Sequence, residues 1–203
     1  HPTGTAPQQR QDLARSTVVE DSTYPEVSNP ELDALCYGLR LDWDGHELHG
    51  VATVTLRTTT ATDRLHLDLL DALAASVALD GKAIASTQSA NLLTMQTGPL
   101  AADSLHTLVI TYAGEPAPVP APSPRGDQTN GLGWVVEADG SVNTFEEPYG
   151  ALTWYPCNDA PSDKAFYDIT VTTPPGTVGV ANGTFVSSSA DSPDASRPAR
   201  WTT

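Results

Sequence analysis

The stretch that decides the fold is LCYGLRLDW, residues 35–43, in which the large residues occupy every second position. Small or charged residues stand between them. Side chains of a β-strand point alternately to its two faces, so this pattern is typical of a strand with one buried face. The sequence therefore predicts a strand here, closed by the turn signal Asp44-Gly45.

Further predicted strands follow along the chain, in short segments that are rich in Thr and Val and separated by turn residues. They are residues 48–57, 65–69, 73–79, 108–112, 134–136, 167–171 and 178–186. Asp80-Gly81 is a two-residue hairpin signal. Because no segment shows a helical period over three turns, we predict an all-β fold, a sandwich of antiparallel sheets.

Acidic residues outnumber basic residues by 25 to 10 in the 203 residues, which gives a formal net charge of −15. A nucleic acid or an anionic membrane surface is bound by clustered Lys and Arg, so this excess argues against both partners. No apolar run approaches the roughly 20 residues of a membrane-spanning helix. Cys36 and Cys157 are too few for a disulfide framework, and they form either one bridge or two buried thiols.

Composition divides the chain into two parts. Residues 1–23 are polar and lack a periodic apolar pattern, which indicates an arm or tail, and residues 24–203 hold the predicted sandwich. Residues 116–124 are rich in proline, and we interpret them as a long loop of the sandwich in preference to a domain linker. Because the chain starts at His1 and its one methionine is Met95, we expect a processed or excised piece.

Complete catalytic motifs are absent from the sequence, which has no H-E-x-x-H pair, no Gly-rich phosphate loop and no Gly-x-Ser-x-Gly elbow. His46 and His49 flank a turn, and we expect polar turn residues there in preference to metal ligands. Residues 137–168 gather carboxylates beside Phe145, Trp154 and Tyr155. An acidic, aromatic surface suits a cationic ligand, either an ammonium or a metal ion, and solubility and turn capping are the alternative role.

The stretch PCNDAPSDKA, residues 156–165, has two prolines that fix the backbone around a cysteine. Asp159 can cap the turn by accepting hydrogen bonds from backbone amides, and Lys164 can pair with a carboxylate. The stretch resembles the Pro-Cys-x-Asp-x-Pro-x-x-Lys-Ala motif of the aminopeptidase N family of zinc metallopeptidases. The residues that carry this motif are Pro156, Cys157, Asp159, Pro161 and Lys164.

Three other stretches resemble the same family, in its order and spacing. Residues 33–42 are similar to its opening strand, residues 48–54 to its Leu-x-Gly-x-Ala-x-Val strand, and residues 180–183 to its Val-Ala-Asn-Gly turn. The resemblance implies a saddle-shaped β domain over residues 24–203, truncated before a thermolysin-like catalytic domain. In the family that second domain carries H-E-x-x-H and the zinc, so this chain is expected to bind no metal and to lack peptidase activity by itself.

The resemblance also implies one substrate-binding carboxylate. In the family, a glutamate ten residues before the motif cysteine reaches toward the free α-amine of the substrate, and counting back from Cys157 gives Glu147. Glu146 is the second candidate, although a strand would point its side chain the other way. The expected function is that of a non-catalytic domain in an aminopeptidase that removes N-terminal residues from peptides. Its expected partners are the peptide N-terminus and the missing catalytic domain.

Two other functions stay open at this point. The chain could be a stand-alone extracellular β-sandwich that binds sugar, calcium or a protein, or an inactive homologue that uses the scaffold for adhesion. Lysine is scarce, the composition is acidic, and the first residues are polar and contain proline. These features favour a secreted or cell-surface bacterial protein, with the cytoplasm as the alternative.

Overall fold

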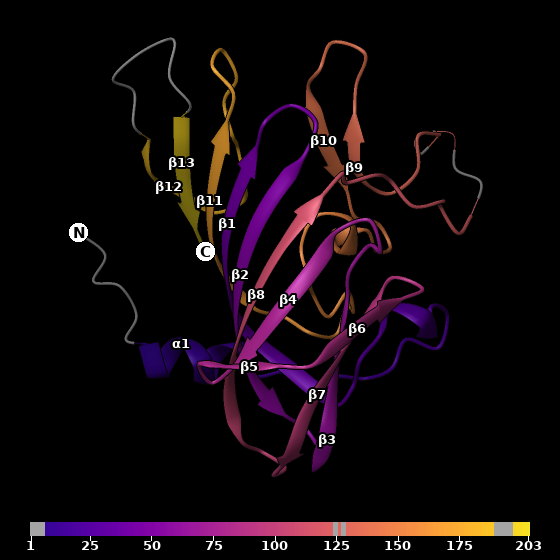
Figure 1. Ribbon diagram of the computed structural model, residues 1–203, viewed down its shortest axis with the longest axis vertical. Coiled ribbons are helices and arrows are strands. Elements are labelled where there is room, and N and C mark those ends of the chain that lie inside the picture. The colour runs from indigo at the N-terminus through magenta and orange to yellow at the C-terminus, as the bar shows by residue number, and fades with distance from the viewer. Residues whose placement is uncertain (1–6, 124–125, 127–128, 189–196) are drawn as a thin grey trace.

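The computed structural model describes residues 7–123, 126, 129–188 and 197–203, and β-strands are its principal elements (Figure 1). The strands are β1 Leu32–Trp43, β2 Leu48–Thr58, β3 Thr62–Asp68, β4 Ala74–Leu79, β5 Lys82–Ile84, β6 Ser86–Ser89, β7 Leu92–Leu100, β8 Leu105–Gly114, β9 Gly133–Val136, β10 Val142–Phe145, β11 Phe166–Thr173, β12 Thr184–Ser188 and β13 Arg197–Thr202. The helices are α1 Pro7–Ala14 and the short 3₁₀ helices η1 Pro25–Val27 and η2 Ala151–Thr153.

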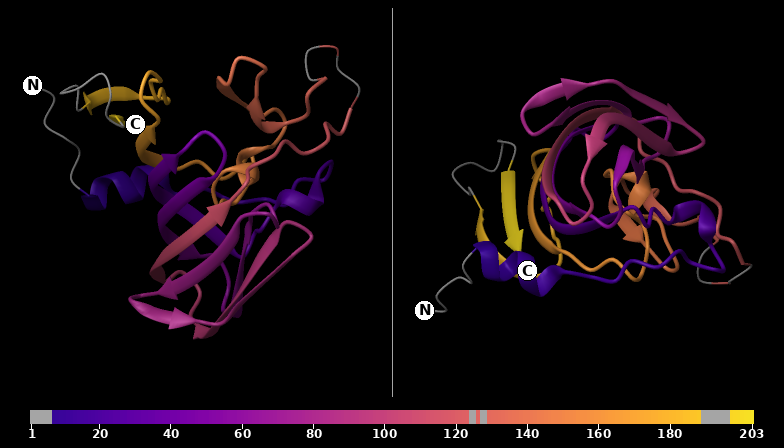
Figure 2. Two further views of the ribbon diagram at one scale, coloured as in Figure 1. Left: turned by 45° about the horizontal axis from the view of Figure 1, so that its top comes forward. Right: turned by 90° about the horizontal axis from the view of Figure 1, so that it is seen from below.

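The described strands form three sheets. The largest has eight strands in the order β12-β13-β11-β1-β2-β8-β4-β5, the second has the order β3-β7-β6, and β9 and β10 form a separate hairpin. The two views of Figure 2 show the eight-stranded sheet bending around the smaller ones, so the fold is an open saddle and not a closed barrel. The predicted all-β, saddle-shaped fold is therefore confirmed.

Strand β1 has the alternation that the sequence predicts. Tyr37, Leu39 and Leu41 are buried on one face, whereas Arg40 and Asp42 are exposed on the other. The strand continues through the turn after Trp43 into β2, with which it pairs antiparallel along its length.

Strand β11 pairs with β1 in parallel, so that Tyr37 lies opposite Tyr167 and Leu41 opposite Val171. The other pairings among the described strands are antiparallel. A parallel pair needs a long connection, and here most of the fold lies between the two strands in the sequence. Residue alternation predicts each strand but not this direction. Because of this parallel pairing, the odd-numbered residues of β1 and β11 lie on the same face of the sheet and form one continuous surface, the β1–β11 wall.

The strand predicted over residues 178–186 is wrong in its first half. Strand β12 begins at Thr184, and residues 178–183 are irregular. Gly183 explains the break, because its φ of 103° is not strand geometry and favours glycine. A Cβ atom at this position would also lie 2.4 Å from the carbonyl oxygen of Thr202.

Helix α1 lies within the segment that the sequence analysis interprets as a polar arm. It has no apolar stripe, so periodicity gives no signal for it. Its Arg10 guanidinium lies 4.7 Å from the centroid of the Phe166 ring and donates a hydrogen bond to the carbonyl oxygen of Thr203. The helix therefore lies beside the last residues of the chain, as Figure 2 also shows. Among the described residues, no helix is long and apolar enough to span a bilayer.

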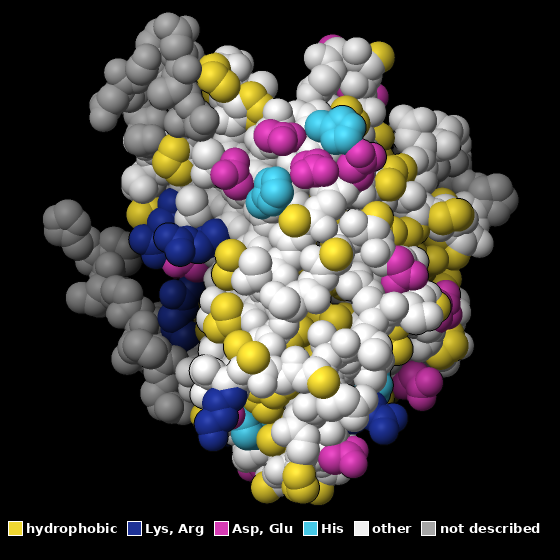
Figure 3. Space-filling model, viewed as in Figure 1, with side chains coloured by type: hydrophobic (Ala, Val, Ile, Leu, Met, Phe, Trp, Pro, Cys, Tyr) yellow, Lys and Arg dark blue, Asp and Glu magenta, His cyan; other side chains and the backbone are white. Residues whose placement is uncertain are grey.

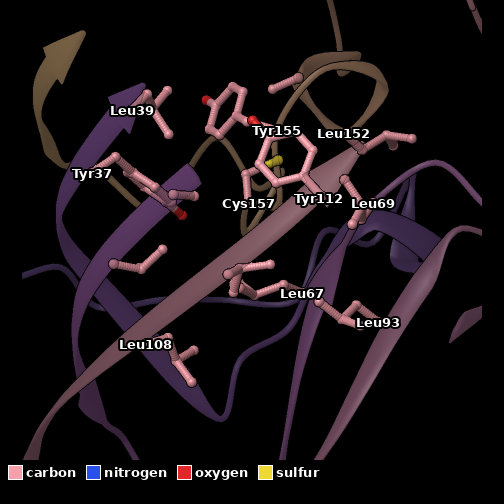
Figure 4. Packing of buried hydrophobic residues seen from close by; sticks show 14 of the residues in the cluster. Tyr37, Leu39, Leu67, Leu69, Leu93, Leu108, Tyr112, Leu152, Tyr155 and Cys157 are labelled. Carbon is pink, nitrogen blue, oxygen red and sulfur yellow. The ribbon is translucent and has the colours of Figure 1, made fainter. Parts of the chain in front are cut away.

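The core lies between the large sheet and the β3-β7-β6 sheet. Figure 4 shows Leu39, Leu108 and Tyr112 of the large sheet facing Leu67 and Leu93 of the small one. The segment of Leu152, Tyr155 and Cys157 closes the same core from one end, and these residues are buried as well. These buried residues belong to the segment 146–165, which runs from the end of β10 through the motif. The core therefore fixes the position of the residues described in the next subsection.

Candidate functional site

The motif of residues 156–165 is tied to β3 through the backbone. Cys157 and Asp68 exchange two backbone hydrogen bonds, of 2.7 and 3.0 Å. The Cys157 side chain is buried, and burial raises the pKa of its thiol well above the ordinary value. Cys36 and Cys157 are both free thiols, so of the two possibilities that the sequence leaves open the structure has the unbridged one.

Asp159 caps the turn before the motif. Its Oδ2 atom accepts hydrogen bonds from the backbone amides of Gly150, at 2.9 Å, and Leu152, at 3.2 Å. Its own amide donates to Oδ2 of Asp68 at 3.0 Å. Burial raises the pKa of both carboxyls, to about 7 for Asp68, because these hydrogen bonds compensate the lost solvation only in part.

Asp163 joins the motif to β1. Its carboxylate accepts hydrogen bonds from the backbone amide of Ala34 at 3.1 and 3.2 Å and from the Asn158 side chain at 2.7 Å. Burial raises the pKa of Asp163 to about 7. Lys164 differs from its expected role: it is exposed, and within the part of the chain that the structure describes it forms no ion pair with a carboxylate. Its backbone amide instead donates to Ser16 Oγ at 3.0 Å.

Hydrogen bonds thus hold the motif to three neighbours: Cys157 to β3, Asp159 to the turn at residues 150–152, and Asp163 to β1. Pro156 is buried within this arrangement, whereas Pro161 is exposed at its surface. These contacts also fix the position of residues 148–155, which include η2 and connect the motif to the two candidate glutamates.

Glu146 and Glu147 follow β10 directly, and the structure separates their side chains. Glu146 Oε1 accepts a hydrogen bond of 2.7 Å from the indole Nε1 of Trp154. Burial raises the pKa of Glu146, the hydrogen bond from Trp154 lowers it, and the charge of Asp159 raises it again. Glu147 is exposed and precedes Pro148 across a cis peptide bond. Of the two, only Glu146 is among the described residues that line the cavity beside this segment.

Glu146 lines a cavity of about 940 Å³ between the β1–β11 end of the large sheet, the β9–β10 hairpin and residues 177–182. Its aromatic lining comes from Trp43, Trp134, Trp154, Tyr155 and Tyr167. The sequence indicates Trp154 and Tyr155 as part of a ligand-binding surface, whereas it indicates Trp43, Trp134 and Tyr167 only as strand residues. Tyr167 joins them through the parallel pairing of β11 with β1, which a sequence pattern does not reveal. Phe145, by contrast, is exposed and does not line the cavity.

Carboxylates and histidines also gather over the turn between β1 and β2, as Figure 3 shows. His46 Nε2 lies 3.2 Å from Glu115 Oε1, and His49 Nε2 lies 3.6 Å from Glu47 Oε2, in exposed pairs. Across the described residues, no group of three or more His, Cys, Asp or Glu side chains could hold a metal ion.

Residues 34–203 match the peptidase M1 N-terminal domain. The chain belongs to this family. Its M1 fold is similar to that of an M1 zinc metallopeptidase from Deinococcus radiodurans, with a TM-score of 0.74 and 28% identity over 85% of this chain and 39% of the other. A mutant of that enzyme bound to a Tyr-Ser-Ala substrate gives 0.74 and 27%, over 87% and 41%.

A two-domain M1 zinc metallopeptidase mutant bound to L-arginine gives a TM-score of 0.77 at 26% identity, over 92% of this chain and 41% of the other. This M1 domain therefore spans 39–41% of the length of these solved relatives. A comparison with curated proteins found no match.

Proposed function

We propose that this M1 domain is the non-catalytic N-terminal part of a zinc-dependent aminopeptidase, which removes N-terminal residues from peptides. The observation that carries the proposal is the family match over residues 34–203. Solved relatives that share this fold are zinc metallopeptidases, and mutants of them hold a Tyr-Ser-Ala substrate or a free amino acid.

The zinc of such an enzyme would be held by a catalytic domain outside this chain. The residues present do not fit the metal, because the described part of the chain offers no cluster of three potential ligands and the sequence has no H-E-x-x-H pair. The proposed partners of this domain are therefore that catalytic domain and the N-terminus of the peptide. The contribution of this chain would be to bind the substrate.

We assign the α-amine of the substrate to Glu147. A carboxylate holds an α-ammonium by charge and hydrogen bonding, and it disfavours an internal peptide segment, which lacks that charge. Glu147 is exposed and stands ten residues before Cys157, the spacing of the family resemblance. Glu146 is the second candidate, because it stands eleven and not ten residues before Cys157.

The test uses the protein encoded by the complete gene, with Glu147→Gln and Glu146→Gln compared on amino-acid arylamide substrates. Where the catalytic domain of the complete protein covers the exposed Glu147 and its amine contact, loss of that contact in Glu147→Gln should cost on the order of 2–4 kcal/mol, or about 30- to 1000-fold in kcat/KM. Glu146→Gln should lose much less, and the 203-residue chain alone should be inactive. Unchanged kinetics of Glu147→Gln would remove this residue from the substrate site. Activity that survives a zinc chelator would contradict the zinc-dependent reaction itself.

The location remains a proposal as well. An acidic surface and scarce lysine support a secreted or cell-surface bacterial protein over a cytoplasmic one. Fractionation of the source cells with an antibody against this domain tests the location, and recovery in the cytoplasmic fraction alone would overturn it.

A further inference from the structure

The cavity beside Glu146 has a wall of adjoining aromatic rings. The centroids of Trp43 and Trp134 lie 5.2 Å apart, those of Trp134 and Trp154 6.4 Å, those of Trp154 and Tyr155 4.3 Å, and those of Tyr155 and Tyr167 6.3 Å. Each ring therefore packs against the next one along the wall. Where ring faces border the cavity, their negative potential attracts a cation.

Glu146 is the one charged side chain among the described lining residues of this cavity. Its Oε1 atom is held by Trp154 at 2.7 Å, and no other described side chain or backbone amide donates a hydrogen bond to the carboxylate. No Lys, Arg or His lines the cavity within the described residues. The hydrogen bond from Trp154 orients the carboxylate, and no described residue that lines the cavity carries a positive charge to neutralise it.

The rest of the lining mixes apolar side chains with uncharged polar ones, such as Asn143, Thr173 and Asn182. Leu41, Ile169 and Val171 come from the wall that the parallel β1–β11 pair forms. Val178 and Val180 lie in the irregular segment of the lining and are 71% and 74% exposed. A volume of about 940 Å³ suits a small organic molecule, for which clefts of roughly 300–1,000 Å³ are usual.

We propose that this cavity binds an organic ammonium ion on an apolar body, with Glu146 Oε2 accepting a hydrogen bond from the ammonium and the aromatic wall contacting the rest. A primary or secondary amine fits better than a quaternary one, because the free oxygen needs an N–H donor. Glu147, to which we assign the α-amine of the substrate, does not line this cavity, and every lining residue named here belongs to this chain.

The test titrates the 203-residue chain with 2-phenylethylamine, with the neutral 2-phenylethanol as the matched ligand. Calorimetry should show saturable binding of the amine and binding at least about tenfold weaker for the alcohol. In nitrogen-15 spectra, the indole signal of Trp154, assigned with Trp154→Phe, should shift on addition of the amine. The indole signal of Trp201, which does not line the cavity, should stay in place.

Two variants separate the cavity from the general negative charge of the chain. Glu146→Gln keeps the shape of the side chain and should weaken amine binding about tenfold or more. Glu137→Gln removes one charge from the same β9–β10 hairpin outside the cavity and should leave the affinity unchanged. Circular dichroism and thermal unfolding establish that both variants fold. Equal affinities for amine and alcohol, equal effects of the two variants, or an unshifted Trp154 signal would each overturn the proposal, and none of these results bears on Glu147.

Discussion

At the scale of single residues, three buried or half-buried aspartates hold irregular backbone segments in place. Asp68, Asp159 and Asp163 each accept hydrogen bonds from backbone amides that have no partner in a strand. A carboxylate accepts several such bonds at once, which explains why short acidic side chains occur in this interior. Burial opposes the arrangement by disfavouring the charged form of each carboxyl.

The two cysteines provide a direct check of this interior. Burial raises the pKa of both thiols, and the charge of Arg10 offsets part of the shift at Cys36. With a thiol-reactive dye at neutral pH, we expect slow labelling of the half-buried Cys36 and no labelling of Cys157 over the same time. Both should react in denaturant, which the mass of the labelled protein measures.

The matched control for this prediction is Cys36→Ser, which should take up no label while folded. Native labelling of this variant would show that Cys157 is accessible and that the packing around it is wrong. Failure of the unmodified chain to react in denaturant would show a disulfide bridge in place of two free thiols.

At the scale of strands, the position of Gly50 in β2 links a sequence motif to the site. A Cβ atom there would lie 2.1 Å from the ring of Tyr112 on β8, and the Tyr112 hydroxyl donates to the carbonyl oxygen of Trp154 at 2.9 Å. Gly50→Ala should therefore displace the ring and destabilise the fold by about 1–3 kcal/mol. Urea unfolding measures this change, and the indole signal of Trp154 should move with it.

The neighbouring strand offers a matched control. A Cβ atom at Gly38 of β1 would meet its nearest atoms at 3.7 Å or more, which is ordinary contact. Gly38→Ala should thus change the free energy of unfolding by less than about 1 kcal/mol. Equal destabilisation by the two variants would show that Tyr112 does not occupy the space above Gly50.

A strand can be predicted from the sequence when its two faces differ in burial. Where one face is buried and the other exposed, as in β1, alternation predicts the strand and its inward residues. Strand β10 was not predicted, because its residues are half-exposed or exposed and show no contrast between faces. The break at Gly183 was missed because the valines around it are typical of strands, whereas the backbone there is set by contact with Thr202.

The candidate site was predicted less completely than the strands. The motif spacing leads to Glu147, and the local pattern leads to Trp154 and Tyr155. Trp43 and Tyr167 join the cavity through pairing over long sequence separations, which composition and period do not encode. The separation of Glu146 from Glu147 follows from alternation after β10, but which of the two faces the cavity depends on how the hairpin packs.

At the scale of the whole molecule, the buried carboxyls predict how stability depends on pH. The pKa values of Asp68 and Asp163 are raised to about 7 in the folded chain, from ordinary values near 3.8. Between these limits the folded state binds more protons than the unfolded state, so the free energy of unfolding must fall as pH rises. The carboxylates with lowered pKa values, Asp80 and Asp168, titrate below about pH 4, so their contribution is constant across the neutral range and does not offset this fall.

We therefore expect the free energy of unfolding to decrease from about pH 4.5 to pH 8, by on the order of 3 kcal/mol for each of these two carboxyls, measured by urea unfolding at constant ionic strength. Asp68→Asn tests the cause, because an amide oxygen can accept the hydrogen bonds from Asn29 and Asp159 without ever becoming charged. This variant should flatten the pH dependence and match or exceed the stability of the unmodified chain at the alkaline end.

Asp80→Asn is the matched control at an exposed site, and it should lower stability at neutral pH while leaving the downward slope in place. Stability that rises from the acidic to the alkaline end would mean that Asp68 and Asp163 are charged in the folded chain. Their backbone hydrogen bonds would then outweigh the cost of burial. The hydrogen bonds that hold the motif of residues 156–165 to its neighbours would be strongest at high pH instead of low pH.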